Sequence, residues 1–183
     1  METQEVRIPV DRIAVLIGQK GGVKKRIEQR MQVRIHIDSE EGDITLSGDD
    51  GLAVYEAANV IKAIGRGFNP KVVELLYSES YTFDLIDITD FSGKSQKAVA
   101  RLKGRVIGQQ GKAWKMIESM TGCVLSVYGK TVGIIGLVED VQTARRAVEM
   151  LLEGAPHGNV YRWLETKQRE IGRRSLEQGL GVG

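Results

Sequence analysis

Cysteine, histidine and proline are scarce in this chain of 183 residues, which contains one Cys, two His and three Pro. The single cysteine, Cys123, excludes an intramolecular disulfide and is typical of a reducing compartment. One cysteine together with His36 and His157, far apart in the sequence, does not suffice for a zinc site of nitrogen and sulfur ligands. We therefore expect neither a metal nor another cofactor.

Long apolar runs and a large excess of one charge are also absent. No stretch approaches the roughly 18 apolar residues that a membrane-spanning helix needs, and residues 1–5 are polar and acidic, unlike a signal or transit peptide. The 26 Lys and Arg against 24 Asp and Glu leave a net charge of +2, which does not by itself indicate nucleic-acid binding. Because 42% of the residues are hydrophobic, we expect a folded, soluble, cytoplasmic protein that does not bind membranes.

The chain does contain an internal repeat. When residues 17–37 are aligned with residues 107–127, seven of 21 positions are identical, whereas ordinary residue frequencies would give about one by chance. The identities are Ile17/Ile107, Gly18/Gly108, Gln19/Gln109, Gly21/Gly111, Lys25/Lys115, Ile27/Ile117 and Glu28/Glu118. The chain is therefore a tandem duplication.

Both copies show the same order of hydrophobic patterns. Apolar residues that alternate with polar ones predict strands, and apolar residues spaced by three or four predict helices. The predicted strands are 6–10, 33–37, 43–47, 81–88, 123–128 and 131–135, and the predicted helices are 13–17, 23–27, 52–64, 95–107, 112–120 and 138–152. The order β-α-α-β-β-α, found twice, favours an α+β fold in which each copy forms an antiparallel three-stranded sheet with helices on one face.

The repeat also sets the expected domain boundaries. We expect a first domain at 1–67, a connector with a short helix at 68–80, and a second domain at 81–156. A C-terminal helix within 157–176 should pack on the body through a stripe of Val160, Trp163, Leu164 and Ile171. Residues 177–183 should form a flexible tail.

Two glycine loops carry the functional signal. Gly-x-x-Gly occurs four times, but only the copies at 18–21 and 108–111 follow an apolar helical residue and precede a basic helix. Residues 12–34 hold seven basic residues and one acidic, and residues 94–115 hold seven basic and none acidic. Glycine lacks a Cβ and a helix N-terminus offers unpaired N–H groups, so such a loop can hold a phosphate backbone. One basic helix alone would be read as a solvated face, but two at matching positions predict polyanion binding.

The strings around both loops resemble the core signature of KH domains. They read Ile17-Gly18-Gln19-Lys20-Gly21-Gly22 and Val106-Ile107-Gly108-Gln109-Gln110-Gly111-Lys112, and type I KH domains share the β-α-α-β-β-α order. The resemblance implies binding of single-stranded RNA or DNA, with the loop clamping the backbone while the bases lie in an apolar groove.

Longer strings narrow the resemblance to one family. Lys-Gly-Arg-Val-Ile-Gly at 103–108, Val-Tyr-Gly-Lys-Thr-Val at 127–132 and Gly-Ala-Pro-His-Gly-Asn-Val-Tyr at 154–161 are similar to segments of the partner-of-Nob-one family, in its shorter archaeal form. These two-KH proteins assemble the small ribosomal subunit. The resemblance implies binding near the 3′ end of small-subunit rRNA or its precursor, and cooperation with the rRNA-maturing endonuclease Nob-one. It also implies contact with the alpha subunit of translation initiation factor two.

The loop between the second and third strands distinguishes the two copies. It is acidic at 39–43 in the first copy but short and basic, Gly129-Lys130, in the second. We therefore expect the second copy to be the main RNA site and the first to be a weaker site or a protein-docking surface.

In the second copy, Gly108, Gln109, Gln110 and Gly111 should clamp the backbone, Ile107 should form the groove floor, and Arg105, Lys112, Lys115 and Lys130 should neutralise phosphate. The counterparts in the first copy are Ile17, Gly18, Gln19, Lys20, Gly21, Lys24 and Lys25.

Four other residues invite functional interpretations. Trp114, three residues after Gly111, is placed either to stack on a base or to pack inward. Trp163 is expected in the core and Cys123 as a buried thiol, since Val33 matches it in the first copy. His36 alternates outward on its strand.

An enzyme finds little support. Gly129-Lys130-Thr131 resembles the end of a P-loop, but Val124 stands where the first glycine is required. No Ser/His/Asp order or carboxylate pair stands out, so we expect no catalysis. Two alternatives to the ribosomal role remain: a KH-type scaffold that binds proteins rather than RNA, and a generic RNA-binding subunit of an RNA-degradation or translation complex.

Overall fold

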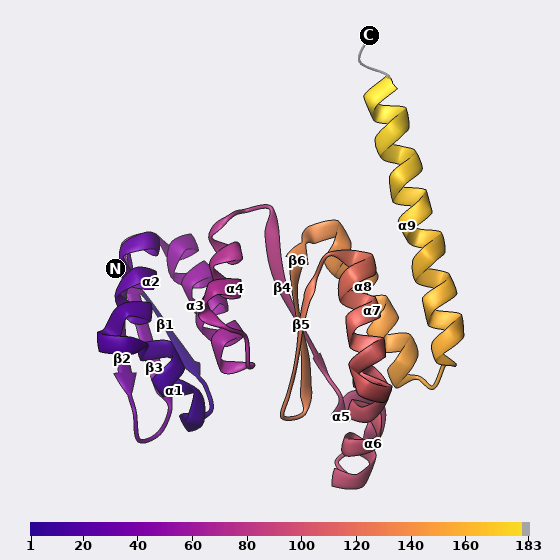
Figure 1. Cartoon of the computed structure of the whole chain (residues 1–183). Coiled ribbons are helices and arrows are strands. Elements are labelled where there is room, and N and C mark those ends of the chain that lie inside the picture. Colours follow the sequence, from indigo (N-terminus) through magenta and orange to yellow (C-terminus); the bar gives the residue numbers. More distant parts are fainter. Residues whose placement is uncertain (181–183) are drawn as a thin grey trace. The chain divides into compact units, whose positions relative to one another are not determined.

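The computed structural model describes residues 1–180, which divide after Phe83 into two compact units (Figure 1). Each unit contains one three-stranded sheet with helices packed on one face, in the order β-α-α-β-β-α. The predicted α+β class and the predicted duplication are therefore confirmed. Among the described residues, no helix combines the length and the apolar character that crossing a membrane requires.

The first unit builds its sheet from three antiparallel strands in the order β1-β3-β2, so β2 lies at an edge. Its main elements are β1 (Glu2–Arg7), α1 (Ile13–Ile17), α2 (Gly22–Met31), β2 (Arg34–Asp38), β3 (Asp43–Gly48) and α3 (Gly51–Gly65). The register pairs Val6 with Ile44 and Ile35 with Leu46, and all four side chains are buried. The alternation seen in the sequence therefore places one face of each strand in the core.

The first strand begins and ends earlier than predicted, at Glu2–Arg7 instead of 6–10. It ends at Arg7, and the chain turns at Pro9 into a short 3-10 segment, Val10–Arg12. Because proline has no N–H to donate to a neighbouring strand, it ends the ladder. Val10, which we expected to alternate inward, is 53% exposed.

The second unit repeats the arrangement with the strand order β4-β6-β5, so β5 is an edge strand. Its elements are β4 (Tyr81–Asp87), α5 (Thr89–Ser92), α6 (Gln96–Ile107), α7 (Lys112–Thr121), β5 (Val124–Tyr128), β6 (Thr131–Leu137) and α8 (Val138–Leu152). The single turn α5 was not predicted, since four residues are too few to show a helical period. Gly129, with φ +54°, occupies the first position of the two-residue turn that joins β5 to β6.

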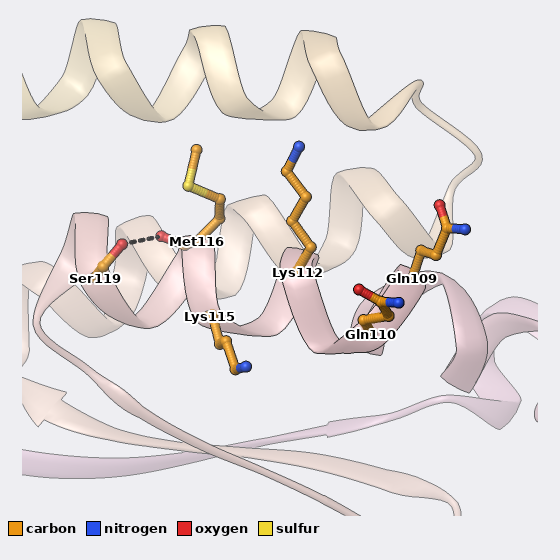
Figure 2. Close-up of a pocket in the computed structure, with 6 residues that line it drawn as sticks. All are labelled: Gln109, Gln110, Lys112, Lys115, Met116 and Ser119. Carbon is orange, nitrogen blue, oxygen red and sulfur yellow. Dashed lines mark hydrogen bonds between the residues drawn. The ribbon is translucent and has the colours of Figure 1, made fainter.

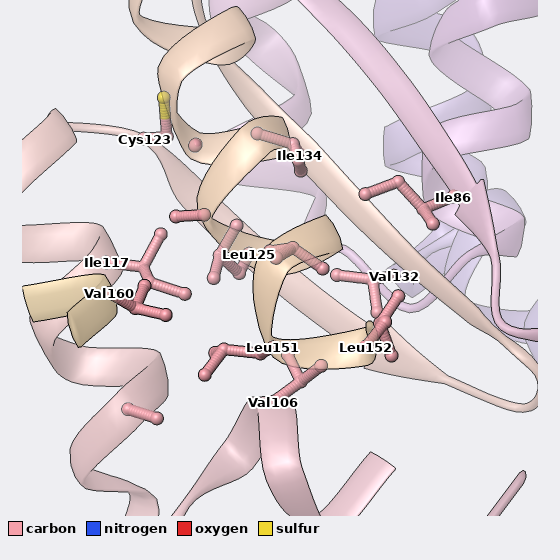
Figure 3. Packing of buried hydrophobic residues seen from close by; sticks show 14 of the residues in the cluster. Ile86, Val106, Ile117, Cys123, Leu125, Val132, Ile134, Leu151, Leu152 and Val160 are labelled. Carbon is pink, nitrogen blue, oxygen red and sulfur yellow. The ribbon is translucent and has the colours of Figure 1, made fainter. Parts of the chain in front are cut away.

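The core of the second unit gathers side chains from every strand and from each of the longer helices (Figure 3). Each of these side chains is at most 3% exposed, so each contributes about 1.5–3 kcal/mol through burial. They include Ile86, Val106, Ile117, Leu125, Ile134, Leu151 and Val160.

Each unit continues past its closing helix with a matching segment. In the first unit this segment is α4 (Pro70–Val73) and the 3-10 turn Glu74–Tyr77, and in the second it is the start of α9 (His157–Leu180). Gly67 and Gly154 both have positive φ, and the residue six positions later, Val73 or Val160, is buried in each case. The repeat thus includes a trailing helix as well as the six elements that the sequence predicts.

The C-terminal helix α9 is longer than predicted. It runs to Leu180, so the residues 177–180 that we expected in a tail are helical, and 181–183 lie outside the described residues. Val160 and Leu164 are buried, and Trp163 packs half-buried against the core. Ile171 is 44% exposed, so it does not belong to the packed stripe that the sequence predicts. α9 has 24 residues and α8 has 15, and α9 lies beside α8 as far as Ile171, so its last turns extend beyond α8.

Candidate nucleic-acid interface

The two Gly-x-x-Gly loops have the same backbone conformation. Gly18 and Gly108 have φ/ψ of 71°/177° and 75°/174°. The third residue of each loop is left-handed although it is not glycine, with 54°/30° at Lys20 and 55°/29° at Gln110. The fourth residue is a left-handed glycine in both loops. The duplication therefore preserves one specific loop geometry and not merely the glycine spacing.

The first glycine of each loop is required by close packing. A Cβ on Gly108 would lie 2.7 Å from the Cβ of Ala113, and a Cβ on Gly18 would lie 2.5 Å from Cγ2 of Val23. The loop backbone is thus held tightly against the first turn of the helix that follows. Such a Cβ would also lie 2.9 Å from the backbone N of Val23 or 2.7 Å from that of Ala113, so the first turn of α2 and of α7 begins directly beside its loop.

A lysine flanks the second glycine of each loop. A Cβ on Gly111 would lie 3.9 Å from Cε of Lys115, and the corresponding distance from Gly21 to Lys25 is 3.8 Å. Both lysines are exposed, and among the described side chains neither forms an ion pair. Each loop therefore has an ammonium group beside it that is available for a phosphate.

In each unit, one glutamate joins the helix that follows the glycine loop, α2 or α7, to the edge strand, β2 or β5. Oε1 of Glu118 accepts a hydrogen bond from the backbone N–H of Leu125 at 2.9 Å, and Glu28 accepts from Ile35 at 2.8 Å. Trp114 lies one turn before Glu118 and therefore on the side of α7 that faces β5. It packs against the core but stays half exposed, so its ring can contribute both to the core and to a surface for bases.

The same position differs in the first unit. Lys24 matches Trp114, and its Nζ lies 3.6 Å from Glu28, so it has a partner within the protein. The β2–β3 loop is also unlike its counterpart, because Arg7 binds Glu41 at 3.0 Å and Asp43 at 3.3 Å. The first unit thus combines an intact glycine loop with an acidic, internally paired neighbour.

In the second unit the corresponding turn carries a single charge, that of Lys130. Lys130 is exposed, and its own carbonyl accepts from the N–H of Ile88 at 2.8 Å, which holds the turn. Ile107, directly before the loop, is half-buried. The second unit therefore contains the loop, Lys115, Trp114 and Lys130. Neither the loop nor the turn contains an acidic residue.

Arg105 forms hydrogen bonds within the protein. Its Nε donates to the carbonyl of Leu151 at 2.8 Å, and its Nη2 donates to the carbonyl of Ala155. Leu151 lies in the last turn of α8 and Ala155 in the segment that follows it, so the arginine supplies a charged donor to carbonyls at this helix end. The guanidinium therefore points into the protein and ties α6 to α8. These contacts occupy the guanidinium of Arg105, which the sequence predicts to neutralise phosphate.

The outer surface of α7 contains a hollow of about 620 Å³ next to the loop (Figure 2). In Figure 2 the side chain of Lys112 extends towards α9, and that of Lys115 extends the opposite way. No carboxylate is among the residues that line the hollow, which are Gln109, Gln110, Lys112, Lys115, Met116 and Ser119.

The remaining predicted residues are placed as follows. Cys123 is buried, which confirms the buried thiol, and burial raises its pKa to about 11. Gly136 packs against it, since a Cβ there would lie 2.5 Å from Sγ of Cys123. His36 is exposed. Within the described residues, no group of three or more His, Cys, Asp or Glu side chains is arranged to hold a metal ion.

Comparisons with known proteins match both units. Residues 82–169 match the family described as a eukaryotic type KH domain (KH domain type I), and residues 3–63 match the KH domain family. A KH domain-containing protein of Methanocaldococcus jannaschii is 48% identical over 176 residues, which are 94% of this chain and 77% of that protein. The pre-rRNA-processing protein PNO1 of Chaetomium thermophilum is 28% identical over 171 residues, covering 88% of this chain and 64% of that protein.

A solved structure has a similar fold over most of the chain. A chain in the crystal structure of an a/eIF2alpha–aDim2p–rRNA complex from Pyrococcus horikoshii superposes with a TM-score of 0.84. The two sequences are 43% identical, and the match covers 92% of this chain and 95% of the other.

Proposed function

We propose that this chain, which belongs to the tandem-KH family of the pre-rRNA-processing protein PNO1, the partner of Nob-one, binds single-stranded ribosomal RNA during assembly of the small subunit. The observation that carries the proposal is the loop at 108–111, with Lys115 beside Gly111 and no carboxylate in the adjoining hollow. A narrow turn of backbone with a neighbouring ammonium group suits a phosphate backbone. The proposed role is binding, without catalysis by the chain itself.

The second unit is the main site in this proposal. Gly108, Gln109, Gln110 and Gly111 clamp the backbone, Lys115 and Lys130 neutralise phosphate, and bases lie beside Ile107 and Trp114. Single-stranded rather than duplex RNA is favoured, because only unpaired bases can turn towards an apolar surface and stack on an aromatic ring.

The first unit is a weaker second site. Its loop, Ile17 to Gly21 with Lys25, has the geometry of a clamp. The paired Lys24 and the acidic β2–β3 loop reduce its attraction for phosphate. We infer that it contributes less to affinity than the second unit.

The RNA and protein partners follow from the family. We propose that the RNA is the 3′ region of small-subunit rRNA or its precursor, and that the chain acts with the endonuclease Nob-one. Contact with the alpha subunit of translation initiation factor two is supported by the similar Pyrococcus chain, which was crystallised in a complex with a/eIF2alpha and rRNA.

Fluorescence anisotropy tests the RNA assignment. A labelled single strand from the 3′ end of small-subunit rRNA is titrated beside a scrambled strand and a duplex, at about 50 mM and 200 mM salt, since phosphate contacts are salt-dependent and blind to sequence. We expect the authentic strand to bind at least tenfold more tightly than the scramble. Equal binding of both strands would leave a generic RNA-binding module, and no binding would favour a protein scaffold.

A pair of loop variants tests the site. Gln109→Asp with Gln110→Asp adds two negative charges at the clamp, and aspartate tolerates the left-handed backbone at position 110. RNA affinity should fall at least tenfold while the thermal midpoint stays nearly constant. The matched change in the first unit, Gln19→Asp with Lys20→Asp, should lower affinity less. A larger effect from the first unit would reverse the assignment of the main site.

A further inference from the structure

We propose that the hollow on the outer face of α7 is a subsite for one further nucleotide, which it holds by the phosphate next to the stretch clamped at 108–111. This inference rests on the proposed function and adds to it a second contact surface. The hollow lies on the outer face of α7, between the side towards α9, where Lys112 extends, and the side towards the strands, where Lys115 extends. A strand that binds there leaves the loop over the outer face of the helix.

The spacing of residues along α7 separates the two surfaces. Lys112, Met116 and Ser119 are spaced by four and three residues and share one face, with Lys115 at its border. Trp114 and Glu118 lie on the side that reaches β5. The loop residues Gln109 and Gln110 line the hollow as well, and Figure 2 shows them at its end next to Lys112. One strand can therefore run from the loop into the hollow without a gap.

The charges around the hollow favour a phosphate. Two lysines and no carboxylate line it, and among the described side chains neither lysine has an ion pair. Nζ of Lys112 lies 5.8 Å from the centre of the Tyr161 ring on α9, which directs the ammonium group to the α9 side of the helix. His157, in the first turn of α9, donates from its Nε2–H to the carbonyl of Arg105 at 2.8 Å, which fixes the start of α9 beside the loop.

The first unit lacks this arrangement. At the position of Lys112 it has Gly22, and at the position of Met116 it has Arg26, which forms a salt bridge with Glu74 of its trailing segment. A carboxylate therefore occupies the corresponding surface of α2. We conclude that only the second unit extends its contact with RNA beyond the loop.

Ser119 offers a way to test the hollow without altering the loop. It lies eight residues after Gly111, about 12 Å along the helix, which exceeds the screening length of about 10 Å in 0.1 M salt. Ser119 is exposed, and its hydroxyl donates to the carbonyl of Met116 at 3.2 Å. Thr166 on α9 is a matched control, because it is exposed and donates in the same way to the carbonyl of Arg162, at 3.0 Å.

The experiment uses the full chain with Gln19→Asp and Lys20→Asp, so that only the second unit clamps RNA. Ser119→Glu and Ser119→Lys are titrated with a tetranucleotide, about the length that one KH loop clamps, and with a single-stranded decanucleotide. We expect Ser119→Glu to weaken decanucleotide binding about threefold and Ser119→Lys to strengthen it by a similar factor. The salt slope should become steeper by about 0.7 in Ser119→Lys, which corresponds to one added phosphate contact. Tetranucleotide binding should not change.

The outcomes separate the subsite from the clamp. Opposite effects of the two charges on the long RNA alone, with no effect of Thr166→Glu or Thr166→Lys, would support the subsite. Equal affinities in all Ser119 variants would overturn it, and so would parallel changes for both RNA lengths or for both positions. If Gln109→Asp with Gln110→Asp leaves binding of both RNAs unchanged, the clamp itself is wrong and the proposed function fails with it.

Discussion

The guanidinium of Arg105 on α6 donates from Nε to the carbonyl of Leu151 at the end of α8, at 2.8 Å. The first unit has the same contact between Arg12 and Ile64, also at 2.8 Å. Arg12 stands five residues before Ile17, whereas Arg105 stands two residues before Ile107. The two copies therefore bind the matching carbonyl at a helix end with arginines from different positions, which shows that the contact belongs to the fold.

Replacing this arginine should affect stability more than RNA binding. Arg105→Met leaves two carbonyls without their charged donor, and we expect the free energy of unfolding to fall by about 1.5–3 kcal/mol. RNA affinity should change less than twofold, because the guanidinium faces the protein. Urea denaturation and anisotropy measure the two quantities. Lys130→Met is the matched control, with the opposite expectation of weaker RNA binding and unchanged stability. A tenfold loss of affinity in Arg105→Met would restore the phosphate role to this residue.

The two glycines of the second loop should differ in their tolerance of a side chain. Gly108 has φ 75° and ψ 174°, a region that is almost exclusive to glycine, and a Cβ there meets Ala113. We expect Gly108→Ala to cost about 3 kcal/mol of stability. Gly111 is left-handed, and a Cβ there would make only an ordinary contact, at 3.9 Å, with Cε of Lys115, so Gly111→Ala should cost about 1–2 kcal/mol and Gly111→Asn less. Urea denaturation of the three variants gives the ranking, and equal costs at both glycines would contradict it.

Trp114 should report directly on bound RNA. The chain has two tryptophans, so Trp163→Phe leaves Trp114 as the only strong emitter. We expect its fluorescence to change when single-stranded RNA binds, because a base stacks on the exposed part of the ring. Trp114→Ala should weaken binding by about 1–3 kcal/mol, and Trp114→Phe should retain most of the affinity. Unchanged emission at saturating RNA would assign Trp114 to the core alone.

Cys123 should make stability depend on pH in the alkaline range. Burial raises its thiol pKa from 9.0 to about 11, so between these values the native protein keeps a proton that the unfolded chain has lost. The stabilisation is complete below pH 9 and is lost as the pH rises towards 11. We expect the difference in unfolding free energy between the wild type and Cys123→Ala to shrink from pH 8 to pH 10.5. A difference that stays constant across this range would show that the thiol is not shielded from water.

Much of the fold could be predicted from periodicity. The strands and the longer helices of both copies lie within a few residues of their predicted positions, because burial of one face imposes a period of two on strands and of 3.6 on helices. Two elements departed from prediction for local reasons. Pro9 ended the first strand before Val10, and α5 was too short to have a period.

The candidate site was predicted less completely than the fold. The glycine loops and their flanking lysines could be predicted from the spacing of residues in the sequence. The geometry of the loop, with its close approach to Ala113 and its left-handed backbone, depends on residues that are near one another in the chain. The distribution of basic residues in the sequence could not show that Arg105 hydrogen-bonds within the protein whereas Lys115 is exposed. Both are basic residues near the loop, but Arg105 donates to the carbonyl of Leu151, 46 residues away in the chain.

The sequence by itself determined the duplication, the α+β class and the two loops, because each depends on a short-range pattern of residue types. Only the tertiary structure decided which cations face solvent, on which side of α7 Trp114 lies, and that α9 begins beside the loop. These features depend on contacts between residues far apart in the chain. Such contacts do not appear in the hydrophobic period of the sequence. A carbonyl at a helix end can accept from an arginine of any segment that folds next to it.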